Sequence, residues 1–179
     1  MGLAVVCGVS MGGYVALAFQ RKFPARVRGL VLVDTRAGAD SADAKGDRDK
    51  TIALARAKGA TTIADKLLPR LLTASATVAQ LSGLRRVMTH QPVEGLVAAL
   101  TAMRDRPDAT ADLKFVEVPT LVVHGADDTL IPPSEAEVLR AGIAGAELVT
   151  IPGAAHLPNF EQPDAFNAAM RTFLKRFEP

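Results

Sequence analysis

Four short runs of apolar, mostly β-branched residues recur along the chain and predict buried strands. They cover residues 3–6, 30–33, 120–123 and, more weakly, 147–151. The runs lack the alternation of apolar and polar residues that a strand with one face in water shows. Turn residues bound each of them. We therefore expect strands that are covered on both faces, as in a parallel sheet.

Segments that read as helices lie between the predicted strands. One covers residues 12–23 and ends before Pro24, and another covers residues 133–141, after Pro132 and before Gly142. A last helix is expected over residues 163–177. Strands that alternate with helices indicate βαβ units. The pattern therefore predicts an α/β fold, a parallel sheet of about four strands with flanking helices.

The middle of the chain has a different pattern. Residues 37–47 are rich in Gly, Ala, Asp and Ser and predict a loop. Helices are then expected over residues 51–68, 77–88 and 93–103, with breaks at prolines 69, 92 and 107. We therefore expect a core made of residues 1–36 and 116–179 and a helical cap inserted between two strands, residues 37–115.

Composition narrows the classes of partner. The 179 residues carry a net charge of +2, with both signs scattered, so no cationic face for nucleic acid is expected. No apolar run approaches the roughly 20 residues of a membrane span. The single cysteine, Cys7, excludes an internal disulfide and is expected to be a buried small side chain. We expect a cytoplasmic protein that acts on a small molecule.

The sequence Gly8-Val9-Ser10-Met11-Gly12 lies between the first predicted strand and the first predicted helix. In this position G-x-S-x-G is typical of a nucleophile elbow, a tight turn that projects a serine at the edge of the sheet. Gly8 and Gly12 are expected to leave room for the turn. The backbone N–H of Met11 is a candidate donor to an oxyanion. The alternative is a glycine-rich turn with an N-capping serine.

His156 is the candidate base for Ser10. It follows the last predicted strand and precedes the last helix, so it lies at the sheet edge where open parallel sheets place their chemistry. The alternative is a loop histidine bonded to backbone. Of the other two histidines, His124 is expected to support the loop after the third strand, and His90 to be exposed in the helical insertion.

Three aspartates compete to orient the base. Asp127 and Asp128 follow the third predicted strand, and Asp34 follows the second. We rank Asp128 first, because it gives the chain order Ser, Asp, His, and we rank Asp34 second and Asp127 third.

A metal site has no support in the spacing of the candidate ligands. Those ligands are His124, Asp127, Asp128 and His156. No H-x-x-x-H or C-x-x-C spacing links them, and no Lys-Ser or Lys-Thr follows the glycines as in a phosphate-binding loop. We therefore expect neither a metal nor a cofactor.

These motifs together resemble the α/β-hydrolase superfamily, and most closely its branch of 3-oxoadipate enol-lactonases and small esterases. The motifs that carry the resemblance are residues 8–13, residues 30–35, residues 124–128 with Pro132, and residues 153–156. The resemblance implies a catalytic triad of Ser10, Asp128 and His156, with Met11 N–H in the oxyanion hole. It implies hydrolysis of a small carboxylic ester or lactone through an acyl-enzyme.

The position of the elbow departs from the family pattern. Family members place four further strands and a second oxyanion donor ahead of the elbow, which here begins at Gly8. We therefore expect weak activity, since losing one donor costs about 100- to 1,000-fold. An unpaired edge on the strand at residues 3–6 predicts a homo-oligomer, with this edge or the last helix at the interface. The alternative function is an inactive binding or assembly module.

Overall fold

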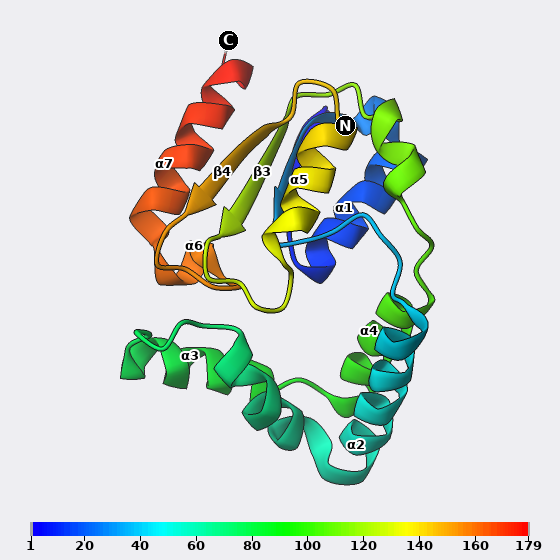
Figure 1. Ribbon diagram of the computed structural model, residues 1–179, viewed down its shortest axis with the longest axis vertical. Coiled ribbons are helices and arrows are strands. Elements are labelled where there is room, and N and C mark those ends of the chain that lie inside the picture. The colour runs from blue at the N-terminus through cyan, green and yellow to red at the C-terminus, as the bar shows by residue number, and fades with distance from the viewer. Residues whose placement is uncertain (1, 179) are drawn as a thin grey trace. The chain divides into compact units, whose positions relative to one another are not determined.

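The computed structural model describes residues 2–178 and contains one sheet of four parallel strands (Figure 1). The strands are β1 (Ala4–Val9), β2 (Val27–Val33), β3 (Thr120–Gly125) and β4 (Glu147–Ile151). They lie in the order β1-β2-β3-β4, and each neighbouring pair is parallel. The predicted fold class, a parallel sheet of about four strands with flanking helices, is confirmed.

Helices cover both faces of the sheet. The helices of this part of the chain are α1 (Met11–Lys22), α5 (Pro133–Gly142), α6 (Pro158–Glu161) and α7 (Pro163–Leu174), with 3₁₀ turns η1 (Pro24–Arg26), η3 (Thr110–Phe115) and η4 (Lys175–Phe177). Leu30 and Leu32 of β2 share a core cluster with residues of α1 and α5, whereas Val31 and Val33 share another with Phe173 of α7. Because successive side chains of a strand point to opposite faces, a strand covered on both faces is apolar throughout.

Residues Gly38–Asp108 form a second compact unit, and the sheet unit comprises the chain up to Ala37 and from Ala109 onward. The helices of this second unit are α2 (Ala42–Leu67), α3 (Val78–Thr89) and α4 (Val93–Asp105), with a 3₁₀ turn η2 (Leu68–Arg70). Its small core includes Ile52 and Ala55 of α2 and Leu100 of α4. The expectation that this insertion is a cap stays a prediction. Among the described residues, no helix has the length and apolar character needed to cross a bilayer.

A buried ion pair ties together the two ends of the second unit. The Arg106 guanidinium donates to Asp40 Oδ1 at 2.7 Å and to the Gly38 carbonyl at 2.8 Å. Arg48 donates to the other oxygen of Asp40 at 2.7 Å. Burial alone would raise the pKa of Asp40, but the hydrogen bonds from Arg48 and Arg106 lower it below its usual value. The two chain segments that enter and leave the unit are therefore held side by side.

The predicted loop over residues 37–47 is partly wrong, because α2 already begins at Ala42. The cause is local. Ser41 is an N-cap whose side chain accepts a hydrogen bond from the Ala44 N–H, and Asp43 places a negative charge in the first turn. Gly59, with a φ of 79°, interrupts α2 further along. Capping residues and a turn composition look alike in sequence, which explains the error.

One expectation about exposure is also wrong. Cys7 is exposed rather than buried, because within residues 2–178 its strand β1 has a neighbour, β2, on one side alone. The apolar stripe of the last helix packs against the core on one face of the sheet, where one of its four members is buried and three are half-buried. The stripe consists of Phe166, Met170, Phe173 and Phe177, and Phe173 is 1% exposed.

Candidate active site

Ser10 occupies the turn between β1 and α1 in a strained backbone conformation. Its φ of 53° and ψ of −116° are values that residues other than glycine rarely adopt. Two hydrogen bonds to the end of β2 hold it there. The Ser10 N–H donates to the Val33 carbonyl at 2.8 Å, and the Thr35 hydroxyl donates to the Ser10 carbonyl at 2.8 Å. These two hydrogen bonds thus hold the backbone of Ser10 in its strained conformation.

The glycines around Ser10 differ in how much space they need. A methyl group at Gly8 would overlap the carbonyl group of Gly12, and one at Gly13 would overlap the side chain of Thr35. A methyl group at Gly12 would meet nothing within 4 Å outside its own helix. The expectation that both Gly8 and Gly12 leave room for the turn therefore holds for Gly8 and is wrong for Gly12.

We expect Gly8→Ala to destabilise the protein and Gly12→Ala to leave its stability unchanged or slightly higher. Overpacking against backbone costs about 1–3 kcal/mol, whereas alanine in a helix is favoured over glycine by about 1 kcal/mol. Thermal unfolding of the two variants, followed by circular dichroism, measures the difference. Equal melting temperatures would show that the backbone at Gly8 can move aside.

His156 lies between Ser10 and Asp128. Its Nε2 is 2.8 Å from Ser10 Oγ, and its Nδ1 is 2.8 Å from Asp128 Oδ2. His156 is 4% exposed and Asp128 is 5% exposed. With Asp128 ionised, Nδ1–H donates to the carboxylate, which leaves Nε2 free to accept the proton of the Ser10 hydroxyl. The fold thus brings together the three residues that the sequence ranked first, each from the loop after a different strand.

Backbone N–H groups hold the carboxylate of Asp128. Leu130 N–H and Ile131 N–H donate to its Oδ1 at 2.7 and 3.1 Å. Burial alone would raise the pKa of Asp128, but the hydrogen bonds from His156 and from these two N–H groups keep its pKa below the usual value. Asp128 is therefore ionised at neutral pH, as the acid that orients a histidine must be.

The loop that carries His156 is clamped by residues that the sequence did not single out. Glu161 Oε2 accepts a hydrogen bond from Ala155 N–H at 2.7 Å, and Gln162 Nε2 donates to the Gly153 carbonyl at 3.0 Å. Glu161 ends the short helix α6, which was not predicted, although Pro158 at its first position is a helix-start signal. These two hydrogen bonds hold the loop at residues 153 and 155, directly before His156.

The other candidates have different surroundings. Asp127 is exposed and its N–H donates to the Ala154 carbonyl at 2.9 Å, whereas His156 contacts the carboxylate of Asp128. His90 is exposed, as expected, and its Nδ1 lies 2.6 Å from the Arg86 carbonyl at the end of α3.

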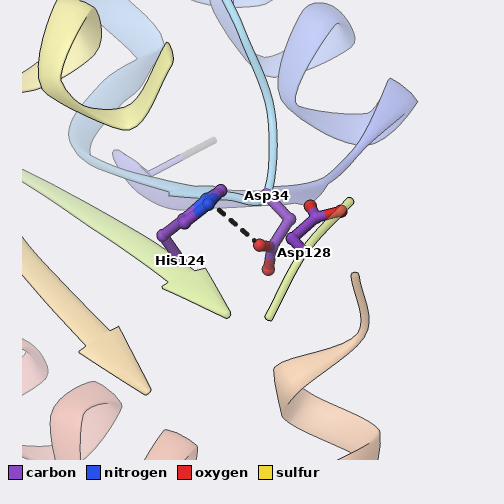
Figure 2. Close-up of side chains that lie close together, drawn as sticks. All are labelled: Asp34, His124 and Asp128. Carbon is purple, nitrogen blue, oxygen red and sulfur yellow. Dashed lines mark ion pairs between the residues drawn. The ribbon is translucent and has the colours of Figure 1, made fainter. Parts of the chain in front are cut away.

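Asp34 and His124 are buried beside Asp128, at the ends of β2 and β3 (Figure 2). Asp34 Oδ1 accepts a hydrogen bond from Gly125 N–H at 2.8 Å and lies 3.2 Å from His124 Nδ1. One possible ligand atom from each of the three residues lies within 4.8 Å of the others, an arrangement that could hold a cation. Sequence spacing gave no signal for this set, because Asp34 is far from the other two along the chain.

Known proteins resemble this chain in sequence. Residues 2–169 match the profile of the Alpha/beta hydrolase family. The chain is 29% identical to 3-oxoadipate enol-lactonase 2 of Acinetobacter baylyi, over 97% of this chain and 64% of that protein. It is 31% identical to a pimeloyl-[acyl-carrier protein] methyl ester esterase of Neisseria meningitidis, over 96% of this chain and 69% of that protein.

A solved structure extends the comparison to three dimensions. The fold superimposes on a thermophilic esterase from Thermogutta terrifontis with a TM-score of 0.95 and 39% identity. The match covers 99% of this chain and 66% of the esterase. The chain therefore spans about two thirds of the length of these relatives.

Proposed function

The chain belongs to the α/β-hydrolase family, and from this premise we propose that it is a serine hydrolase acting on small carboxylic esters or lactones. The observation that carries the proposal is the chain of two hydrogen bonds from Ser10 through His156 to Asp128, each 2.8 Å long. A nucleophile, a base within hydrogen-bonding reach and a carboxylate behind the base form the arrangement that activates a serine hydroxyl.

In the proposed reaction, Ser10 Oγ attacks the acyl carbon while His156 Nε2 takes the hydroxyl proton. Asp128 holds the ring in the tautomer that can accept this proton and stabilises the imidazolium that forms. The tetrahedral intermediate collapses when the imidazolium returns the proton to the departing alkoxide, which leaves an ester of Ser10. Water, deprotonated by the same histidine, then hydrolyses this acyl-enzyme and restores the hydroxyl of Ser10.

We place one donor of the oxyanion hole at the backbone N–H of Met11. Met11 is the first residue of α1, directly after Ser10. The first N–H groups of a helix have no acceptor within the helix, and the helix dipole favours negative charge at this end. A donor at this position would stabilise the oxygen on which charge develops.

Esters and lactones are proposed as substrates because the relatives are named for that chemistry. The Acinetobacter protein is an enol-lactonase, and the Neisseria and Thermogutta proteins are esterases. Both reactions break the bond between an acyl carbon and an alkoxy oxygen. They differ in whether the leaving group stays attached to the acyl part, so one triad serves both.

The experiment that tests this function measures covalent labelling and turnover together. A fluorophosphonate probe should add one mass increment to the intact protein, on the peptide that contains Ser10. Short p-nitrophenyl esters should be hydrolysed above the background rate. If neither labelling nor hydrolysis occurs in folded protein, the alternative function, a binding or assembly module without catalysis, replaces this one.

We further propose that the protein assembles into homo-oligomers through β1. In the part of the chain that the structure describes, β1 pairs with β2 alone, and Leu3, directly before β1, is 58% exposed. An unpaired apolar strand edge favours association with another strand. Light scattering during size exclusion at micromolar concentration should give a mass above that of one chain. A single monomeric species with cooperative unfolding would contradict this expectation.

A further inference from the structure

Asp34 is a buried carboxyl group for which the proposed reaction has no use. It stands at the end of β2 with a φ of 41°, an uncommon value for a residue other than glycine. Its N–H donates to the Val123 carbonyl at 3.0 Å, and its Oδ1 accepts from Gly125 N–H at 2.8 Å. Both bonds reach the end of β3, where the loop that carries Asp128 begins.

The residues on either side of Asp34 contact the opposite part of the site. Val33 and Thr35 provide the two hydrogen bonds that hold the strained backbone of Ser10. Three consecutive residues therefore link the turn of the nucleophile to the loop of the acid. Strained conformations such as those of Ser10 and Asp34 persist when the surrounding contacts hold them in place.

Two carboxyl groups that are buried side by side do not both ionise, because each negative charge disfavours the other. Asp128 keeps its charge through the hydrogen bonds from His156, Leu130 and Ile131. Burial raises the pKa of Asp34 to about 9, against the opposing effect of the Gly125 N–H, and the charges of Asp128 and Glu161 add to the rise. Asp34 is therefore protonated at neutral pH.

His124, the histidine beside this pair, brings no positive charge at neutral pH. Burial lowers the pKa of His124, and the nearby His156 lowers it further, although Asp128 opposes the shift. Neither ring nitrogen of His124 has a hydrogen-bond partner among the described residues, and its Nδ1 faces Asp34 at 3.2 Å. A neutral imidazole beside a neutral carboxyl group leaves the charge of the cluster on Asp128.

We propose that Asp34 is a positioning residue, which joins the strand end that holds Ser10 to the loop that carries Asp128 and gives Asp128 an uncharged neighbour. The catalytic part of this inference rests on the proposed function. A cation held by Asp34, His124 and Asp128 is the competing explanation of the cluster. It is less favoured because both oxygens of Asp128 already accept hydrogen bonds, one of them from His156.

The test compares Asp34→Asn with Asp34→Ala. Asparagine keeps an oxygen for Gly125 N–H and is neutral at every pH, so it reproduces the protonated aspartic acid. We expect Asp34→Asn to retain kcat within about 3-fold, and Asp34→Ala, which lacks the acceptor, to lose about 10-fold or more. We expect the labelling rate of Ser10 in the parent to fall as Asp34 ionises near pH 9. This fall should be absent in Asp34→Asn.

Thermal stability gives a readout that does not depend on catalysis. Between the ordinary pKa of aspartate and a pH of about 9, the folded parent keeps the proton of Asp34, whereas the unfolded parent has lost it. Parental stability therefore falls as pH rises through this window, and the asparagine variant escapes the fall. The gain in melting temperature of Asp34→Asn should be at least about 3 °C larger at pH 8 than at pH 5. Asp127→Asn, the exposed control, should change little at either pH.

Each outcome decides a separate question. Equal gains at pH 5 and pH 8, or a loss of kcat in Asp34→Asn as large as in Asp128→Asn, would overturn the proposal. A rise in the melting temperature of the parent with Zn²⁺ or Mg²⁺ that chelation reverses and Asp34→Asn abolishes would overturn it in favour of a cation site. If the parent neither turns over nor labels, the proposed function fails, and the comparison at two pH values still tests the protonation of Asp34.

Discussion

Ser10→Ala should abolish ester hydrolysis and fluorophosphonate labelling. Without the hydroxyl, neither the acyl-enzyme nor the phosphonyl adduct can form, so the rate should fall on the order of 10⁴-fold or more. Initial rates with p-nitrophenyl esters and intact mass after labelling measure the loss. The melting temperature should stay close to that of the parent, because the contacts that hold residue 10 involve its backbone N–H and carbonyl.

Ser82→Ala is the matched control for this substitution. Ser82 is exposed on α3, and its hydroxyl contacts the Ala79 carbonyl one turn earlier at 3.2 Å. Its loss should leave both readouts unchanged. If Ser10→Ala keeps the parental rate in purified protein, the nucleophile is another residue and the proposed reaction is wrong.

Asp128→Asn should lower kcat by about 10⁴-fold. The side-chain amide can present its N–H to His156 Nδ1 and so stabilise the wrong tautomer, the effect seen when the aspartate of a trypsin triad is replaced in this way. His156→Ala should cause a loss of similar size, because the serine then has no base. Rates near neutral pH, with the melting temperature as a check on folding, measure both effects.

Asp127→Asn offers a control that differs by one position in the chain. Asp127 is exposed, and its backbone, not its carboxylate, holds the loop, so we expect a change of less than about 3-fold. The pair therefore separates the charge that faces His156 from charge elsewhere in the same loop. A larger loss in Asp127→Asn than in Asp128→Asn would require the loop to rearrange before the reaction.

Chain order made the core of the site predictable. In a parallel sheet, the loops after successive strands gather at one edge, so a serine, an aspartate and a histidine that each follow a different predicted strand are expected to meet. The prediction needed no exact strand ends, and β2 begins at Val27 rather than at the predicted Leu30. Of the three aspartates that compete in the sequence, Asp128 is the one that contacts His156.

The residues that support the site were not predictable in the same way. Whether Thr35 reaches the Ser10 carbonyl depends on the register between β1 and β2, in which Val9 lies opposite Val33. No local pattern encodes that register. Glu161 lies in a four-residue helix that is too short to show periodicity. The contact between Thr35 and Ser10, which are 25 residues apart, leaves no trace in a single sequence.

The closed base of the helical insertion has a consequence for how the chain can vary. Arg106 bonds to Asp40 and Gly38, and the Ala109 N–H donates to the Ala37 carbonyl at 3.0 Å, so the segment leaves and returns through one narrow junction. The entropic cost of closing the insertion depends on bringing its two ends together at this junction. This cost grows only slowly with the length of chain beyond the junction. Substitutions, insertions and deletions beyond the junction can therefore accumulate while the sheet keeps its geometry. Selection on the helices of the insertion and selection on the residues at the strand ends can therefore act on separate stretches of the gene.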